Sequence, residues 1–435
     1  MRRRTAVSAV LTGGLLLAVS ATSLATLTEA PPAAVQQTVA TAPVDPLAAA
    51  VAAAQQRLAR VPGDHATWAQ LGQAYVEQAR VTADPSLYDK ADGALRESLR
   101  LRPDGNDTAL AGQGALANAR HDFAAAADLA GQAVAIDPYD ATAWGVLTDA
   151  RTQLGDHDGA TEALARMLEL QPGTASFTRA SYDAELRGDL VNARGALEQA
   201  LELAPDPAAQ AWCRTQLGAL AFSTGDLDEA GRQVAAGLAA APDEPELLLA
   251  QARVLAARGE VDAAVAGFRA VADARPLPEH LVEFGEYLES LGRDDEASAQ
   301  YALVETVRRL FAAGGVSDDL STALFAADHG DPQAAVAAAE AEFTRRQNTD
   351  AHDALAWALH SAGRDGEALA HAQAATALGG ANASFLYHRG AVEAALGRTD
   401  QARDTLTAAL DANPHFSPLH APRARQLLDS LGGPR

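Results

Sequence analysis

The sequence predicts an all-α protein, a right-handed α-solenoid of about ten helix-turn-helix units. Three observations predict it: a glycine that recurs every 33 to 38 residues, an alanine five residues after each glycine, and a proline near the end of most units. The recurring glycines are Gly155, Gly188, Gly225, Gly259, Gly292, Gly330, Gly363 and Gly397. A repeat of this length is typical of stacked helical hairpins, because each unit buries its apolar face only against its neighbours.

The composition excludes several classes of protein. Lys and Arg number 34 against 57 Asp and Glu, which gives a net charge of -23, and Lys90 is the only lysine. We expect no nucleic-acid partner, because such binding depends on clustered Lys and Arg that neutralise phosphates. With 48% hydrophobic and 21% charged residues, the chain is expected to be globular. The single Cys213 permits no internal disulfide.

The N-terminal residues 1–25 are predicted to be a signal peptide or an N-terminal anchor. Arg2, Arg3 and Arg4 precede an uncharged stretch from Ala6 to Leu27. Whether or not this segment is cleaved, the arginines are expected to stay on the cytoplasmic side, so the body is expected to be extracytoplasmic, either secreted or cell-envelope associated. Membrane contact is expected only through an uncleaved N-terminus. Residues 26–45 are rich in Pro, Ala and Thr and are predicted to be a flexible tether.

Residues 46–418 are predicted to form the solenoid, which starts with a half-unit helix. Seven residues before each recurring glycine stands a small residue, and nine residues after it most units carry a larger apolar one. We expect the two helices of a unit to cross where the small residues lie, because small side chains let two backbones approach closely. The small residues are Thr148, Ser181, Gly218, Ala252, Gly285, Ala323, Ala356 and Gly390, and the larger ones are Leu164, Leu197, Val234, Phe268, Tyr301 and Leu406.

The turn residues also predict two helices per unit. The glycine suits a left-handed residue at the end of the first helix. An aspartate three residues later suits an N-cap or the first turn of the second helix, as at Asp158, Asp228, Asp262, Asp295 and Asp400. Second helices are expected to stop before Pro62, Pro103, Pro138, Pro172, Pro205, Pro242, Pro276 and Pro414.

Some units depart from this pattern. The first unit carries extra residues around Thr82 to Leu87, and Arg309, Gln347 and Gly380 stand where the terminal proline is expected. We therefore expect the units from about Leu281 to Arg346 to bend or lengthen. Residues 419–435 are predicted to be a closing helix and tail.

The repeated residues resemble the tetratricopeptide repeat family of helix-turn-helix units, and the chain looks like a bacterial exported repeat protein. The best matching unit holds Trp68, Leu71, Gly72, Tyr75, Ala91 and Pro103. A second holds Trp144, Leu147, Gly155, Ala160, Leu164 and Pro172. The resemblance implies a long concave surface that holds a protein or peptide, here an unknown partner that is itself exported or membrane-bound.

Candidate partner-binding residues lie on the predicted first helices: Tyr182, Arg253, Trp357, His360 and Tyr387. Trp357 and His360 share a helix face, which suits a binding hot spot, although an ordinary contact between repeats is the alternative. Because the first helices also carry many carboxylates, we expect a partner of basic or neutral polar character.

Two function classes remain open on the sequence alone. The first is a non-enzymatic scaffold with no cofactor and no metal site, favoured because no nucleophile elbow, phosphate-binding loop or HExxH motif occurs. The alternative is an enzyme or enzyme subunit with a site grafted on the solenoid groove. A histidine and a carboxylate paired in a deep, water-poor pocket would favour the alternative. Cys213 is expected to be a buried apolar residue, not a nucleophile.

Overall fold

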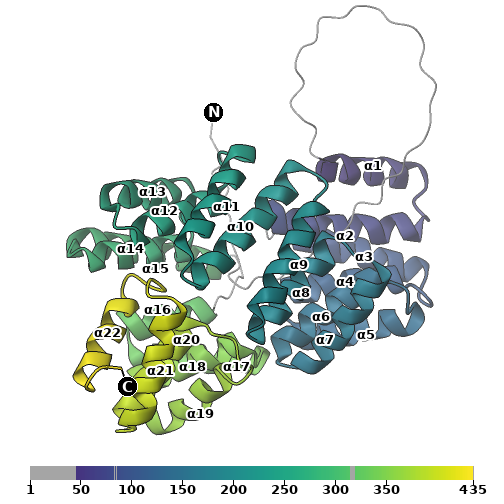
Figure 1. Ribbon diagram of the computed structural model, residues 1–435. Helices are drawn as coiled ribbons and strands as arrows, with labels where there is room; N and C mark the ends of the chain where they lie inside the picture. The colour runs from purple at the N-terminus through teal and green to yellow at the C-terminus, as the bar shows by residue number, and fades with distance from the viewer. Residues whose placement is uncertain (1–45, 83, 85, 314–318, 435) are drawn as a thin grey trace, which may run out of the picture. The chain divides into compact units, whose positions relative to one another are not determined.

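The computed structural model describes residues 46–82, 84, 86–313 and 319–434. These residues form 22 α-helices and no strand (Figure 1). The interpretations of residues 1–25 as a signal peptide or anchor and of residues 26–45 as a tether lie outside the described residues. Within the described residues, no helix is long and apolar enough to cross a membrane.

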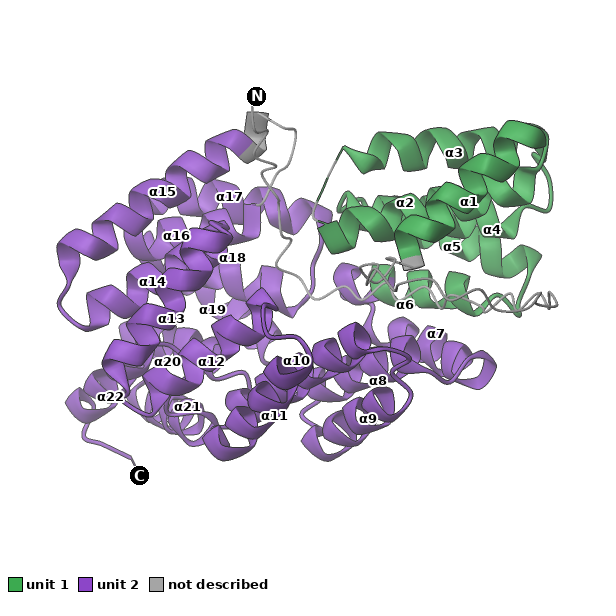
Figure 2. Ribbon diagram, turned by 90° about the horizontal axis from the view of Figure 1, so that it is seen from above, with its two compact units in different colours: residues 1–7, 16–150 green, residues 8–15, 151–435 purple. Residues whose placement is uncertain are grey.

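The chain divides between Ala150 and Arg151 into two compact units (Figure 2). Unit 1 holds the described residues up to Ala150, with the helices α1 (Pro46–Arg60), α2 (His65–Thr82), α3 (Leu87–Leu101), α4 (Asp107–Ala119), α5 (Phe123–Ile136) and the first part of α6 (Ala141–Leu154).

Unit 2 holds the described residues from Arg151 onward. After the last turn of α6 its helices are α7 (His157–Leu170), α8 (Thr174–Leu186), α9 (Leu190–Glu202), α10 (Pro207–Ser223), α11 (Leu227–Ala240), α12 (Pro245–Ala257), α13 (Val261–Ala274), α14 (Pro278–Ser290), α15 (Asp294–Ala313), α16 (Asp319–His329), α17 (Pro332–Arg345), α18 (Thr349–Ser361), α19 (Asp365–Ala375), α20 (Ala383–Ala395), α21 (Thr399–Ala412) and α22 (His420–Ser430).

The predicted all-α repeat fold is confirmed. From α2 to α21 the helices follow one another as ten first-and-second pairs, with α1 before them and α22 after them. Within a unit, the two helices of a pair pack on each other, as α10 and α11 or α20 and α21 do. Successive pairs then stack, and several first helices also contact the next first helix, as α16 contacts α18.

The turns between paired helices follow the expected chemistry. Seven of the eight recurring glycines have a positive φ, as Gly155 does at 81° and Gly188 at 75°. The aspartate directly after Gly155 and Gly188 is the N-cap: Asp156 accepts a hydrogen bond from Gly159 N, and Asp189 accepts one from Asn192 N. The aspartates three residues after the glycines, such as Asp158, lie in the first turn.

Gly330 corrects the expectation of a left-handed residue at every recurring glycine. It has no positive φ, and the next residue, Asp331, is extended, with φ -86° and ψ 118°. Pro332 follows as the first residue of α17. Because a proline excludes the helical conformation from the residue before it, this turn takes a different path from the other seven.

The helix ends also follow the prolines. α13 ends at Ala274 before Pro276, and α21 ends at Ala412 before Pro414. α15 continues through Arg309, where the proline is missing, and reaches 20 residues. The expected lengthening of this region is therefore observed, because no residue in the run forces the helix to stop.

The small residues lie where paired helices cross, as expected. A Cβ atom on Gly390 would lie 2.7 Å from Leu406 Cγ, and one on Gly285 would clash with the ring of Tyr301. These pairs join the small column to the larger column of the same unit. The large side chain on the second helix therefore fills the space beside the small residue on the first helix. This explains why small residues recur at one position of the repeat and large residues at the other.

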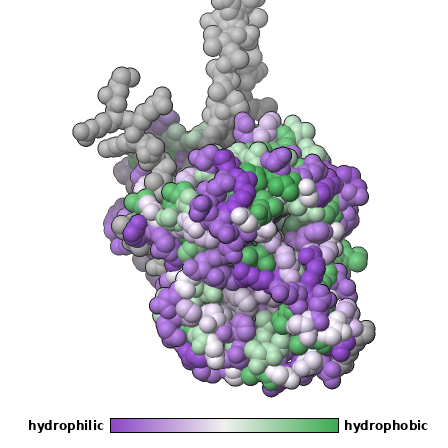
Figure 3. Space-filling view, turned by 90° about the vertical axis from the view of Figure 1, so that its left-hand side faces the viewer, coloured by the Kyte–Doolittle hydropathy of each residue, from purple (hydrophilic) through white to green (hydrophobic). Residues whose placement is uncertain are grey.

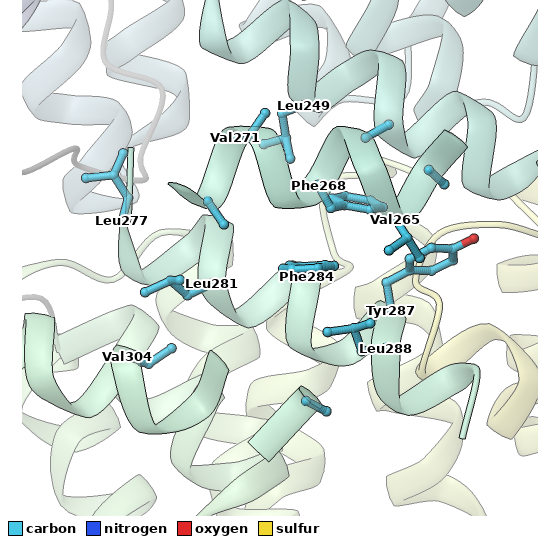
Figure 4. Close-up of a cluster of buried hydrophobic side chains, with 14 of the residues drawn as sticks. Leu249, Val265, Phe268, Val271, Leu277, Leu281, Phe284, Tyr287, Leu288 and Val304 are labelled. Atoms are coloured by element: carbon cyan, nitrogen blue, oxygen red, sulfur yellow. The ribbon is translucent and has the colours of Figure 1, made fainter. Parts of the chain in front are cut away.

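An apolar cluster of unit 2 extends from α12 to α16 (Figure 4). Phe268 of α13 stacks on Phe284 of α14 with ring centroids 6.2 Å apart, and Tyr287 lies 5.1 Å from Phe268. Leu277, Leu281 and Leu288 complete its buried centre. Aromatic pairs at these separations stabilise the contact beyond the area they bury.

Trp68 and Trp144 in unit 1 have equivalent structural contacts. Each indole Nε1 donates to the carbonyl oxygen of the proline six residues earlier, Pro62 at 2.8 Å and Pro138 at 3.0 Å. Both tryptophans therefore tie the start of a first helix to the turn before it. This repeated bond gives both tryptophans a structural role at the helix start.

Candidate functional site

The two ends of unit 2 meet. A Cβ atom on Gly155 would lie 2.6 Å from the carbonyl oxygen of Gln347, and one on Gly188 would clash with the carbonyl oxygen of Gly379. Gly225 lies beside Pro414, where a Cβ atom would make an ordinary contact with Pro414 Cδ at 3.4 Å. The turns before α7, α9 and α11 thus contact the segments after α17, α19 and α21. We call this set of contacts the seam.

Hydrogen bonds between distant residues support the seam. Gln153 Oε1 accepts from Arg346 Nη1 at 2.9 Å across 193 residues and from Asn348 Nδ2 at 3.1 Å. Asn413 Nδ2 donates to the carbonyl oxygen of Phe222 at 2.9 Å across 191 residues. Gln153, Arg346, Asn348 and Asn413 are buried. Buried polar groups are costly unless they are paired, so these bonds favour the closed arrangement.

The seam also explains why two positions that were expected to hold a proline hold another residue. Gln347 and Gly380 stand where a proline was expected, and both lie at the seam. The carbonyl of Gln347 faces Gly155, and a Cβ atom on Gly380 would lie 2.9 Å from the carbonyl oxygen of Leu186. Only glycine permits that approach at position 380 without displacing the backbone.

The seam brings the first helices α8 and α18 into one electrostatic environment. Burial raises the pKa of Glu185 on α8, and the charge of Asp350 on α18 raises it further. Burial also raises the pKa of Asp350, with Asp353 adding to the shift and Arg346 opposing it. The pKa of Tyr182 is raised by burial first and then by Asp350 and Glu185. All three side chains are half-buried, so this group combines restricted hydration with access to water.

Of the predicted site residues, Tyr182 thus belongs to this group, which we call the acidic group: Tyr182, Glu185 and Asp350. Arg253 lies elsewhere, on α12, where it forms a two-bond ion pair with Glu283 of α14 at 2.6 and 2.7 Å. Its side chain is 41% exposed, so its charge is engaged but remains reachable from water.

The structure brings the other three predicted residues together in a second group. The ring of Trp357 lies 5.1 Å from His360 and 5.6 Å from Tyr387. Trp357 also stacks flat on His388 at 4.1 Å, and its Nε1 donates to Asp328 Oδ1 at 3.1 Å. The expected shared helix face of Trp357 and His360 is therefore observed.

This second group is mostly buried. Trp357 is 6% exposed and Tyr387 5%, whereas His360 is half-buried. The closing helix α22 supplies His420, whose ring lies 5.0 Å from Tyr387, so it covers a face that the sequence pattern leaves open. Burial favours the interpretation of Trp357 and Tyr387 as packing residues, and a role of any of these three residues in partner binding stays a prediction.

Two buried histidine–carboxylate pairs lie in the same group. His388 Nδ1 lies 2.9 Å from Asp353 Oδ2, and His420 Nε2 lies 3.0 Å from Asp328 Oδ1. Burial raises the pKa of Asp328, but its hydrogen bonds with His420 and Trp357 and the charges of His420 and His388 lower it below its usual value.

These pairs are the feature that was expected to favour an enzyme. His388 Nε2 has no hydrogen-bond partner among the described residues. However, His388 is only 4% exposed and its ring lies flat on Trp357, so a substrate would reach it only after the aromatic core opened. General base catalysis needs hydrogen-bond reach to the substrate, so the pairs support packing more than catalysis.

Other candidate chemistry is also disfavoured. Burial raises the pKa of the Cys213 thiol to about 11, so this side chain is protonated at neutral pH and is a poor nucleophile. Across the part of the chain that the structure describes, no three His, Cys, Asp or Glu side chains come together as a metal site.

Sequence reasoning missed Asp350, Arg346 and the seam itself. Arg346 bonds Gln153 across 193 residues, and Asp350 acts on Glu185 of α8, which is also far away in the sequence. No local pattern encodes such distances. The sequence did carry one signal for the seam. Gln347 and Gly380 replace the expected terminal proline, and the backbone at both positions contacts the other side of the seam.

The sequence comparison matches part of the chain to a known family. The tetratricopeptide repeat family model matches residues 117–180, which run from α4 into α8. These residues are tetratricopeptide repeat sequence. Proteins with this repeat bind other proteins or peptides and are generally non-enzymatic scaffolds, and the fold described above suits protein–protein interaction.

Solved structures of other tetratricopeptide repeat proteins are similar to this chain. A protein of Thermus thermophilus is 23% identical, covers 44% of this chain and 98% of its own, and has a TM-score of 0.38. A repeat protein of Parabacteroides merdae is 18% identical, with 60% and 99% covered and a TM-score of 0.36. Yeast Tom70 is 13% identical, with 89% and 85% covered and a TM-score of 0.39. No curated protein matches the chain.

Proposed function

We propose that this protein is a non-enzymatic scaffold that works outside the cytoplasm and binds a partner protein or peptide on the first helices of unit 2. The observation that carries the proposal is the acidic group, in which α8 and α18 present Tyr182, Glu185 and Asp350 to one another. A partner that contacts both helices would bury side chains that already have restricted hydration. Such contacts lose less water than fully exposed ones, which favours binding.

The partner is proposed to be basic or neutral polar. Burial raises the pKa of both carboxyl groups, and the charge of Asp350 raises that of Glu185 further. A guanidinium or ammonium group between them would offset their negative charges and donate hydrogen bonds to both carboxylates. An acidic peptide would add a third negative charge to the same place.

Binding is tested with immobilised extended peptides that are basic, neutral or acidic and otherwise matched in length. We expect the basic or neutral peptides to bind and the basic ones to weaken with salt. The variant Glu185→Gln with Asp350→Asn should lose about tenfold or more in affinity for the basic peptides. The control Asp158→Asn with Asp228→Asn changes two carboxylates of the same sign on α7 and α11, whose side chains are 95% and 85% exposed, and should bind as the unaltered protein does.

Tight binding of an acidic peptide that salt does not weaken would contradict the proposed partner chemistry. Equal losses in the two double variants would contradict the proposed location. An in-cell cross-linking experiment with the same variants then asks whether a discrete exported or membrane-bound protein is captured by the unaltered protein and lost from the Glu185→Gln, Asp350→Asn variant.

The proposed extracytoplasmic location of the protein rests on the N-terminal sequence alone. Arg2, Arg3 and Arg4 before the uncharged stretch Ala6 to Leu27 support export. Residues 1–45 fused to a reporter that folds only where disulfides form should give an active reporter, and the version with the three arginines changed to glutamate should give much less. An inactive reporter in both fusions would contradict an extracytoplasmic function.

A further inference from the structure

Two histidines face each other within one repeat of unit 2. His352 of α18 and His371 of α19 have their Nδ1 atoms 3.0 Å apart, and their ring centroids are separated by 5.2 Å. Phe343 of α17 lies edge-on to both rings, at 4.8 and 5.1 Å. Both histidines are half-buried, so the pair has an aromatic neighbour and also partial access to water.

The repeat itself does not require histidine at either position. His352 stands eleven residues before the recurring glycine Gly363, and His371 stands eight residues after it. Five of the other seven units hold an apolar residue at the first position and a small or polar one at the second: Trp144 with Ala163, Phe177 with Ala196, Leu248 with Gly267, Leu281 with Gln300, and Leu386 with Thr405.

The same two positions also meet in another unit. Arg214 Nη1 donates to Gln233 Oε1 at 3.0 Å, and these residues stand eleven before and eight after Gly225. The helix pair therefore brings the two positions together wherever the side chains are long enough. Only the unit of Gly363 places an imidazole at both of them, so the histidine pair is a feature of this unit and not a need of the fold.

The distance between the two nitrogens selects a coordination geometry. An imidazole binds a transition metal through an unprotonated ring nitrogen, with a bond of about 2.0–2.1 Å. With such bonds, two nitrogens 3.0 Å apart subtend an angle of about 95° at the metal ion. Adjacent ligands of square-planar or tetragonal Cu²⁺ and Ni²⁺ subtend about 90°, whereas tetrahedral Zn²⁺ needs about 109° and hence nitrogens about 3.3 Å apart.

We propose that His352 and His371 form a site for a divalent metal ion of tetragonal preference, Cu²⁺ above Ni²⁺, with both Nδ1 atoms bound to one ion. Water supplies the remaining ligands, since both side chains are half-buried. The ion joins α18 to α19 and stabilises the folded unit, because the two ligands are close only when these helices are packed. Metal binding needs no partner protein, so the site stands apart from the proposed function.

Metal binding needs both Nδ1 atoms free of protons, and the surroundings of the rings favour this. Burial, with His371 adding to the shift, lowers the pKa of His352 to about 4, and burial lowers the pKa of His371. Both rings are therefore neutral at pH 7. The one proton between the two Nδ1 atoms moves through water to Nε2 of the ring that carries it, so each ring stays neutral as the ion binds.

The site differs from the metal sites that sequence motifs reveal. The expectation of no metal site rested on motifs such as HExxH, and two histidines 19 residues apart match none of them. No three His, Cys, Asp or Glu side chains gather as a metal site in the described parts of the chain, so this site has two protein ligands and an ion that exchanges with solvent.

Copper binding is measured in the full-length protein by electron paramagnetic resonance, with one equivalent of Cu²⁺ and an excess of glycine to remove weakly held ions. We expect one retained ion whose pulsed spectrum shows two coordinated imidazoles. His352→Gln and His371→Gln should each lower the affinity by about tenfold or more, because two linked ligands bind far more tightly than one. The double variant should lose little more than either single variant.

His415→Gln is the matched control. This histidine is also half-buried and lies in the turn after α21, outside the pair. Its variant should retain the ion, and the signal of two imidazoles, as the unaltered protein does.

Competition with Ni²⁺ and Zn²⁺ identifies the class of metal. Most nitrogen and oxygen sites favour Cu²⁺ over both of its neighbours. Here we expect Ni²⁺ to bind more tightly than Zn²⁺ as well, because the nitrogen distance of 3.0 Å suits an angle near 90°. Zn²⁺ binding more tightly than Ni²⁺ would show that the rings move apart into a tetrahedral site, and it would overturn the assigned class.

A spectrum without two coordinated imidazoles in the unaltered protein would overturn the site and leave an ordinary hydrogen-bonded pair. Equal affinities in the unaltered protein and the double variant would do the same. Circular dichroism checks that each variant is folded. If the variants are not folded, diethyl pyrocarbonate labelling of the unaltered protein decides: Cu²⁺ should protect His352 and His371 but not His415, and equal labelling with and without Cu²⁺ would overturn the site.

Discussion

Unit 2 contains two kinds of contact between helices, and they differ in both chemistry and sequence distance. Between neighbouring repeats, Phe268 and Phe284 stack inside an apolar cluster, and Tyr301 fills the space opposite Gly285. At the seam, Gly155 and Gly188 approach the backbone of residues about 190 positions away, and Gln153 bonds Arg346. The first kind supplies stability by burying apolar area, whereas the second fixes how far the stack turns and adds only a few polar bonds.

The surface is consistent with this division. The face shown in Figure 3 mixes hydrophilic and hydrophobic side chains without one dominant apolar area. The exposed large apolar residues, such as Tyr139 at 75% and Val191 at 84%, belong to different helices. Single exposed apolar side chains are ordinary on protein surfaces. The apolar side chains that stabilise the fold are therefore those buried between the repeats.

The largest effect is expected from Phe284→Ala. This ring is 1% exposed and contacts Phe268, so its loss leaves a cavity and should lower the free energy of unfolding by about 3–5 kcal/mol. Chemical denaturation followed by circular dichroism measures the change. Val191→Ala in the same unit should change it by less than about 0.5 kcal/mol. Similar losses in the two variants would show that the cluster in Figure 4 is not the stabilising centre of unit 2.

The next effect separates the seam from its turns. Gly188→Ala and Gly259→Ala place alanine at φ 75° and 76°. The left-handed backbone should therefore lower the free energy of unfolding by a similar amount in both variants. A Cβ atom on Gly188 would clash with the carbonyl oxygen of Gly379, whereas one on Gly259 would have nothing within 4 Å. We expect Gly188→Ala to lower the free energy of unfolding by about 1–3 kcal/mol more than Gly259→Ala, measured by chemical denaturation. Equal losses would mean that the seam is not closed in solution.

A smaller effect is expected from the polar part of the seam. Gln153→Ala removes the acceptor of Arg346 and Asn348, two buried donors, and should cost about 1–3 kcal/mol. The measurement is a double-mutant cycle with Asn348→Ala, which separates the shared bond from other losses. A coupling energy of zero would show that the two side chains do not interact.

The smallest effect should have the opposite sign. Gly195 lies within α9 and has nothing within 4 Å of a Cβ atom, so Gly195→Ala should raise the free energy of unfolding by up to about 1 kcal/mol. Gly285→Ala is its matched comparison, since the same change there meets Tyr301 and should destabilise. If both glycine-to-alanine changes stabilise, the size match between Gly285 and Tyr301 is not a packing constraint.

Much of the fold was predictable because it is local. The terminal proline at Pro276 ends a helix within two residues, and the match between Gly390 and Leu406 lies inside one unit. Gly330 was the exception, because the proline that follows it two residues later changes the path of its turn. The candidate site was less predictable. The sequence pattern allowed Trp357 to face the solvent, but His420 of α22 covers its ring.

The sequence by itself therefore determined the helices, their pairing and the columns of small and large residues, because those depend on interactions within about 40 residues. Only the tertiary structure decided which distant turns of unit 2 meet at the seam, and hence that Glu185 and Asp350 become neighbours. The position of that meeting depends on small angles between successive repeats that add up over the stack. The total of these angles cannot be read from any single residue. Gly155, Gly188 and Gly380 nevertheless permit the close backbone contacts at the seam.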